Sequence, residues 1–94
     1  MEIVLKEQDA KGFAMAQQDG KRTGAMTYSI AGEHLIIIDH TEVDPAFKGQ
    51  QIGQKMLYKI VDMAREKDIK IIPLCPFAAA QFKKLDAIQD VLKS

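Results

Sequence analysis

The chain has 94 residues, a length that suits one small domain, residues 1–94, with a single hydrophobic core. Hydrophobic residues make up 47% and charged residues 28%, which is the composition of a globular protein and not of a disordered chain. Thirteen Lys and Arg balance thirteen Asp and Glu, so no general attraction to nucleic acid or to an anionic membrane is expected. Apolar runs such as Leu35–Ile38 are too short to span a bilayer.

The single cysteine, Cys75, excludes an internal disulfide and a four-cysteine metal cage, so no metal site is predicted. No charged and then apolar leader with a cleavage site opens the sequence. These two features together predict a reducing, cytoplasmic location.

The first half of the chain predicts an antiparallel meander. Short runs of alternating apolar and polar residues are typical of strands, and the glycine-bearing segments between them are typical of tight turns. The expected strands are Glu2–Lys6, Gly12–Gln17, Ala25–Ile30 and the longer His34–Val43.

The second half predicts two helices around one more strand. Apolar residues recur at helical spacing over Gln50–Lys67, and Ile69–Cys75 is an aliphatic run that Pro73 and Pro76 bring to an end. A final short helix is expected over Phe77–Leu85, and the tail Asp86–Ser94 is expected to form a short helical turn. Strand, helix and strand form a βαβ unit with parallel strands, so the fold class is α/β (α+β), a meander running into a βαβ unit.

A glycine-bearing turn joins the fourth strand to the long helix within Val43–Gly53, which reads VDPAFKGQQIG. The first N–H groups of a helix have no partner inside it, and the helix dipole adds positive charge, so an anion is stabilised there. Gly49 and Gly53 lack a Cβ and allow a ligand to approach closely, while Lys48 adds a mobile positive charge. The turn predicts a phosphate site, and a purely conformational role for the glycines is the alternative.

The segment Lys48-Gly49-Gln50-Gln51-Ile52-Gly53 resembles a loop that reads Q/R-x-x-G-x-G/A and binds acetyl-coenzyme A in the GNAT-type N-acetyltransferase superfamily. Lysine leads the segment here, and the second glutamine holds the place of the central glycine. Farther along, Cys75, Ala78 and Phe82 correspond to the asparagine, alanine and tyrosine acid of the superfamily, so the tyrosine is absent. The text PLCPFAAAQF resembles the short one-domain branch that has a cysteine, and the resemblance extends from about Glu33 to Lys84.

This resemblance implies a minimal acyl-CoA N-acyltransferase-like fold and an enzyme that uses acetyl-CoA as its co-substrate. It implies that Val43 contacts the pantetheine arm and that the phosphates lie against the glycine turn. The residues predicted to bind the cofactor are Thr41, Glu42, Val43, Lys48, Gly49, Gln50, Gln51, Ile52, Gly53, Gln54 and Phe77.

Two residues are candidates for catalysis. Cys75 precedes a helix N-terminus, which favours the thiolate, and it is a candidate nucleophile or acetyl acceptor; a small buried apolar residue is the alternative. His40 is a candidate base for an amine or a partner for the thiol, and a hydrogen-bonded structural histidine is the alternative. Strand alternation places His40 and Glu42 on one face and Thr41 on the other with Leu35, and the strand register decides which face meets Cys75.

The expected function is transfer of an acetyl group from acetyl-CoA to an unidentified amine, on a small molecule or a protein, either directly or through Cys75. A non-catalytic acyl-CoA-binding module is a second hypothesis, and a partner-binding protein with an empty turn is a third. No nucleic acid or membrane partner is expected. The short N-terminal part predicts a thinly covered sheet face, so a monomer and a homodimer that buries this face both remain open.

Overall fold

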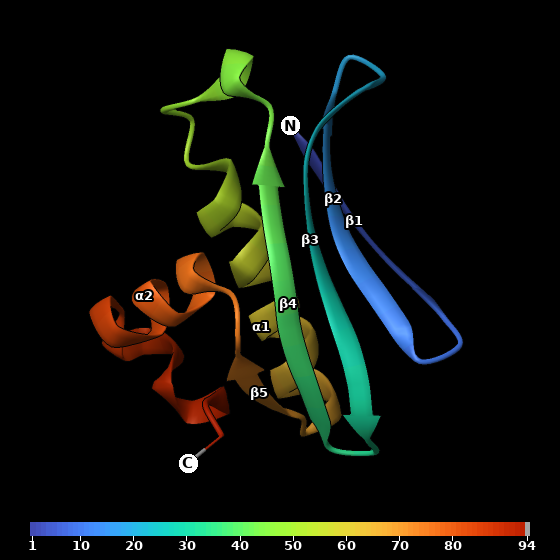
Figure 1. The fold of residues 1–94 in the computed structure, drawn as a ribbon, viewed down its shortest axis with the longest axis vertical. Helices are drawn as coiled ribbons and strands as arrows, with labels where there is room; N and C mark the ends of the chain where they lie inside the picture. Colours follow the sequence, from blue (N-terminus) through green and yellow to red (C-terminus); the bar gives the residue numbers. More distant parts are fainter. Residues whose placement is uncertain (94) are drawn as a thin grey trace.

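The computed structural model describes residues 1–93, which form a five-stranded sheet with helices packed against it. The strands lie in chain order across the sheet: β1 (Glu2–Gln8), β2 (Lys11–Gln18), β3 (Lys21–Gly32), β4 (Leu35–Val43) and β5 (Lys70–Pro73). β1 to β4 form an antiparallel meander, and β5 is parallel to β4. Figure 1 shows this sheet with α1 (Ile52–Lys67) behind it and α2 (Pro76–Lys84) beside β5. The predicted fold class is confirmed.

α1 connects β4 to β5 and covers one face of the sheet. Its apolar residues recur three and four positions apart, so they share one side of the helix, and each is at most 2% exposed: Ile52, Met56, Leu57, Ile60, Val61 and Ala64. On the sheet, Ala14, Ala16 and Met26 are fully buried under this side. The small alanines let the helix lie close to β2. Neither α1 nor α2 combines the length and the apolar character that a bilayer crossing requires.

The boundaries differ from the predicted ones where the backbone takes a left-handed conformation. β3 begins at Lys21 and not at Ala25, because Asp19 and Gly20, with φ of 53° and 77°, complete the turn before it. α1 begins two residues later than predicted because Gln51 has φ 58° and ψ 34° and cannot be part of a right-handed helix. β5 ends at Pro73, so Cys75 lies beyond the strand.

A bulge interrupts the pairing of β3 with β4. Tyr28 lies opposite Ile38 and Thr27 lies opposite His40, so Asp39 is an extra residue on β4 without an opposite partner. The bulge shifts the alternation of side chains by one position for the rest of the strand.

Each residue of β4 after the bulge therefore lies on the opposite face of the sheet from the one that regular alternation predicts. Thr41 lies opposite the fully buried Met26 and faces α1, so its predicted grouping with Leu35 was wrong. His40 and Glu42 share a face, as predicted, and this is the face of the sheet opposite α1.

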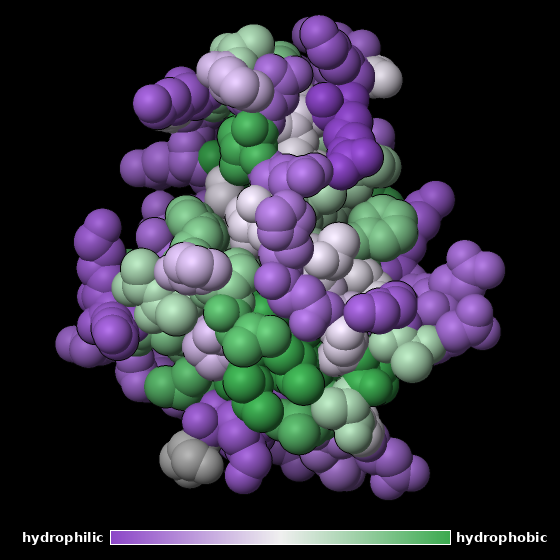
Figure 2. All heavy atoms as spheres, in the orientation of Figure 1, coloured by the Kyte–Doolittle hydropathy of each residue, from purple (hydrophilic) through white to green (hydrophobic). Residues whose placement is uncertain are grey.

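The face opposite α1 carries half-buried apolar side chains, among them Phe13, Met15 and Ile37. Figure 2 views the molecule from this side and shows apolar atoms gathered over the lower half of β4.

The tail folds back onto β5. Asp86–Val91 form a 3-10 helix that buries Ile88 and Val91, which confirms the predicted helical turn up to Val91; the predicted turn extended to Ser94, which lies outside the described residues. Leu92 forms a parallel bridge with Ile71, and the Lys93 N–H donates to the Ile71 carbonyl at 2.9 Å.

Candidate active site

The loop after β4 is held in place by its own hydrogen bonds. The Asp44 side chain accepts from the Ala46 N–H at 2.9 Å, and Pro45–Phe47 form a 3-10 turn. Gly49 follows with φ 89°, and no atom lies within 4 Å of the place where a Cβ would stand. The space above Gly49 is therefore open to a ligand, and the cofactor-binding role predicted for Gly49 stays a prediction.

The N-terminus of α1 follows directly. No side chain of residues 1–93 caps this helix, so its first N–H groups, from Ile52 onward, are available to an anion. Gln51 occupies the place of the central glycine in the acetyl-CoA loop pattern, and its left-handed backbone explains why glycine suits that place. Gln51 carries the strain that a glycine would avoid.

Gly53 lies against an aromatic ring. A Cβ on Gly53 would stand 2.7 Å from Cζ of Phe77 and 3.0 Å from its Cε2. The sequence predicted that Gly53 lacks a side chain in order to admit a ligand. In the structure the space beside it is filled by Phe77, which links the start of α1 to the start of α2. The roles predicted for Gly53 and Phe77 in cofactor binding stay predictions.

Cys75 caps α2 at the point where β5 separates from β4. The Ile38 carbonyl accepts hydrogen bonds from the N–H groups of Leu74 at 3.0 Å and of Cys75 at 3.1 Å. The Cys75 side chain is 5% exposed, and its Sγ accepts from the Ala78 N–H at 3.4 Å. Thr41 Oγ1 lies 3.2 Å from the same Sγ. The sulfur thus has two hydrogen-bonding neighbours, and its burial is also what a small apolar residue would show.

His40 lies on the other side of β4 from Cys75. Neighbouring strand residues point to opposite faces, so a Thr41 side chain that contacts Cys75 leaves the His40 imidazole on the face opposite α1. There His40 Nε2 lies 3.3 Å from Glu42 Oε1, and both side chains are more than half exposed. The structure does not bring His40 to the thiol. Its predicted role as base for an amine stays a prediction.

Thr41 is the contact of Cys75 that sequence reasoning missed. Thr41 was predicted only as a cofactor residue, and the alternation of β4 placed it on the wrong face. Pairing with β3 creates the bulge that turns it toward Cys75, so the strand sequence alone carries no signal for this contact.

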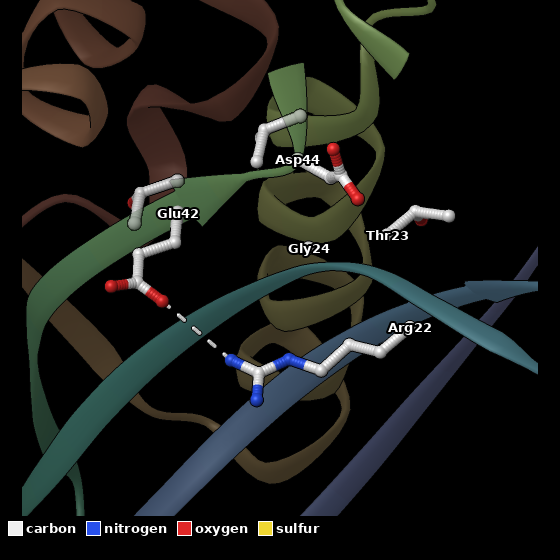
Figure 3. Close-up of a pocket in the computed structure, with 7 residues that line it drawn as sticks. Arg22, Thr23, Gly24, Glu42 and Asp44 are labelled. Atoms are coloured by element: carbon white, nitrogen blue, oxygen red, sulfur yellow. Dashed lines mark ion pairs between the residues drawn. The ribbon is translucent and has the colours of Figure 1, made fainter. Parts of the chain in front are cut away.

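An open hollow of about 660 Å³ lies where β3 begins and β4 ends. Figure 3 shows its lining, with Arg22 reaching from β3 toward Glu42. Arg22 and Glu42 form an ion pair at 3.7 Å, and the remaining lining comes from Thr23, Gly24, Thr41, Val43 and Asp44. Three of the predicted cofactor residues therefore border one hollow. Within residues 1–93 no three His, Cys, Asp or Glu side chains group as metal ligands.

β4 has a free backbone edge beside this hollow. Parallel pairing with β5 runs from the Leu35–Lys70 pair to the Ile38–Pro73 pair. Beyond Ile38 the structure pairs no described residue with β4 on that side, so those N–H and C=O groups over 40–43 that do not bond to β3 face a gap. An extended ligand arm in this gap would find hydrogen-bonding partners along the strand.

Comparisons with known proteins identify the same architecture. A family described as GCN5-related N-acetyl-transferase matches residues 12–91. A GCN5-like protein from Staphylococcus aureus is 33% identical, with 97% of this chain and 88% of that chain covered and a TM-score of 0.72. No curated protein matches the chain.

Two enzymes share the fold at lower identity. The ribosomal-protein-alanine N-acetyltransferase of Brucella melitensis biovar Abortus 2308 is 19% identical, with 80% of this chain and 62% of that chain covered and a TM-score of 0.67. The aminoglycoside N-acetyltransferase AAC(6')-Iy, solved with CoA, is 15% identical, with 86% and 68% covered and a TM-score of 0.61.

The family match spans most of the described residues and includes both the glycine turn and Cys75. The predicted resemblance and the predicted enzyme class, an acetyltransferase, are thereby confirmed. The chain belongs to the GCN5-related N-acetyltransferase family.

Proposed function

We propose that the chain transfers the acetyl group of acetyl-CoA to an amine at the gap between β4 and β5. The observation that carries this proposal is the separation of the two strands after Ile38 and Pro73, next to an uncapped helix start. Acetyl-CoA is the co-substrate expected of this family, and CoA is present in the structure of the similar AAC(6')-Iy.

The glycine turn is the proposed phosphate site. The open space at Gly49 and the first N–H groups of α1 suit the pyrophosphate, and Lys48 supplies a positive charge beside them. The gap along β4 takes the pantetheine arm, with Val43, which is 36% exposed, as an apolar contact. The other residues predicted to bind the cofactor lie next to these two segments in the sequence, except Phe77 of α2, whose ring lies against Gly53.

Direct transfer needs a base for the amine. The amine nitrogen gives up a proton and attacks the thioester carbonyl carbon; the C–N bond forms, the C–S bond breaks, and the coenzyme A sulfur leaves as a thiolate that takes up a proton. Those N–H groups over 40–43 that do not bond to β3 would polarise the carbonyl oxygen. His40, whose Nε2 lies 3.3 Å from the accepting carboxylate of Glu42, is the proposed base. Phe82, at the place of the superfamily's tyrosine acid, is buried in the core and has no proton to give.

A two-step route through Cys75 is the alternative mechanism. The Sγ would attack the thioester, carry the acetyl group and pass it to the amine, with coenzyme A leaving in the first step. Thr41 and the Ala78 N–H would stabilise a thiolate. The 5% exposure of Cys75 favours direct transfer, because this sulfur would have to become more accessible to react.

An isotope-edited NMR titration with acetyl-CoA tests the proposed site. We expect shifts concentrated over 43–54, and we expect Lys48→Gln to weaken binding several-fold. Lys59→Gln is the matched control, because Lys59 is an exposed lysine of α1 away from the turn. No shift at millimolar acetyl-CoA, or equal effects of the two variants, would contradict the phosphate site.

Acetylation assays with Cys75→Ala separate the two routes. Direct transfer predicts that this variant still produces acetylated amine and that the wild type carries no acetyl group on Cys75 by mass spectrometry. An acetylated Cys75 in the wild type, together with loss of product in the variant that still binds acetyl-CoA, would establish the two-step route.

A further inference from the structure

Arg22 borders two hollows. One is the hollow at the ends of β3 and β4 that Figure 3 shows. The other, of about 220 Å³, lies over β2 and β3 and is mainly apolar; besides Arg22 it is lined by Phe13, Met15, Ala25 and Thr27. A guanidinium thus stands between an apolar pocket and the rim where acetyl transfer is proposed.

Opposite charges meet at this border. Arg22 Nη2 lies 3.7 Å from Glu42 Oε2, and the two side chains are 59% and 63% exposed. The other carboxylate oxygen of Glu42 lies 3.3 Å from His40 Nε2. An exposed ion pair of this kind contributes little to stability, so a ligand that carries both charges can replace it at small cost.

We propose that the acetyl acceptor is a free α-amino acid with an apolar side chain. Its carboxylate accepts paired hydrogen bonds from the Arg22 guanidinium, its ammonium lies against Glu42, and its side chain enters the apolar pocket. A single carbon joins the ammonium and the carboxylate of an α-amino acid. This short separation matches that of the Arg22 and Glu42 charges, which lie 3.7 Å apart. This inference rests on the proposed function.

The same arrangement brings the amine to a base. His40 lies within hydrogen-bonding range of Glu42, so an ammonium held by Glu42 has an imidazole beside it to accept its proton. The neutral amine then attacks the thioester carbonyl carbon, with the bond changes given above. Thr41 and Cys75 lie on the other side of β4, so the acceptor and the thiol would not compete for one space.

Other acceptor chemistries match this surface less well. A polyamine or a lysine side chain has no group for Arg22 and would be repelled by it. An acid without an amine would be repelled by Glu42. Asp44 also borders the hollow and keeps its negative charge although it accepts from the Ala46 N–H, so cadaverine is the competing cation in the titration below.

NMR titration of the CoA-saturated protein with L-leucine tests the proposal. We expect shifts at the amides of Arg22, Ala25 and Glu42. Leucinamide lacks the carboxylate and 4-methylpentanoate lacks the amine, so each should bind at least tenfold more weakly than leucine. Equal binding of leucine and leucinamide, or tighter binding of cadaverine than of leucine, would overturn the inference.

A variant pair sharpens the test. Arg22→Gln should weaken leucine binding at least tenfold and should not weaken leucinamide binding, because leucinamide has no carboxylate for Arg22. Lys21→Gln removes the adjacent positive charge and should leave both unchanged. An equal loss in both variants would mean that net charge and not Arg22 binds the carboxylate, and this would also overturn the inference. The ligand series on the wild-type protein gives its answer even if a variant does not fold.

Titrating CoA before leucine distinguishes this inference from the function on which it rests. CoA shifts over 43–54 without any leucine response would overturn the amino-acid acceptor alone. A leucine response without CoA shifts would overturn the acetyl-CoA site and leave the amino-acid site standing. Formation of N-acetylleucine, detected by mass spectrometry, is the expected result when acetyl-CoA replaces CoA.

Discussion

Replacing Gly53 by alanine tests what the absence of a side chain at this position is for. The new Cβ would stand 2.7 Å from Phe77 Cζ, which is closer than packed carbon atoms approach. Forcing extra atoms into a packed site costs about 1–3 kcal/mol. Alanine recovers at most about 1 kcal/mol through its higher helix propensity. We therefore expect Gly53→Ala to lower the free energy of unfolding by about 1 kcal/mol.

Removing the ring should reverse the sign of this effect. In a Phe77→Ala background the clash is absent, so Gly53→Ala should raise the free energy of unfolding by up to about 1 kcal/mol. The two substitutions would then be coupled by about 2 kcal/mol, which urea unfolding of the four proteins, followed by circular dichroism, resolves. Equal effects of Gly53→Ala in both backgrounds would refute the reasoning.

Coenzyme A binding to the same four proteins separates ring packing from ligand contact. If only the ring requires a glycine, Gly53→Ala should weaken binding in the presence of Phe77 and have no effect in its absence. If a phosphate also approaches the Gly53 backbone, the substitution should weaken binding in both backgrounds. The second outcome would support the role first predicted for Gly53.

Three further substitutions test other features of the fold. Gln51→Gly should raise the free energy of unfolding by about 1 kcal/mol, because glycine adopts φ 58° without strain; an unchanged urea midpoint would contradict this. Burial and a 2.6 Å hydrogen bond to Glu7 raise the pKa of Tyr28, so the stability that it contributes is present below about pH 10 and declines above it. Tyr28→Phe should cost about 1–2 kcal/mol at neutral pH and flatten the alkaline part of a stability profile; an unchanged alkaline slope would argue against this origin. Hydrogen bonds from Arg65 lower the pKa of Asp90, so this contribution is present above pH 3.8 and is lost as the pH falls below that value. Asp90→Asn should reduce stability at neutral pH and make stability depend less on pH in the acid range. Thermal unfolding measured from roughly pH 2 to pH 7 tests this. If the stability curves of variant and wild type run parallel over that range, the prediction is refuted.

The arrangement of elements could be predicted because each has a local signal. The spacing of Ile52, Met56 and Ile60 is visible without any partner, and the order of strand, helix and strand allows few topologies. Boundaries were less predictable where one residue changes the backbone. Gln51 has a left-handed conformation that glutamine does not usually adopt and that its residue type does not predict, so the start of α1 was placed too early.

The candidate site could be predicted only in part, because its contacts depend on pairing between distant segments. The bulge at Asp39 exists only in relation to β3, and it decides that Thr41 and not His40 meets Cys75. Similarly, the ring that lies on Gly53 comes from Phe77 in the next helix. The glycine turn, in contrast, is one continuous segment, so its position was visible in the sequence, and at Gly49 the space is open.

The contact of the tail with β5 has a consequence for how molecules of this chain meet one another. A bare edge strand offers unpaired backbone groups to a neighbouring molecule, and pairing of this kind leads to aggregation. Leu92 and Lys93 occupy part of the β5 edge at Ile71, while the other edge of the sheet, β1, carries the charged Glu2 and Lys6. Proteolytic loss of the last turn would therefore do more than loosen the core. It would uncover a short aliphatic strand to which the β5 strand of a second truncated molecule can add.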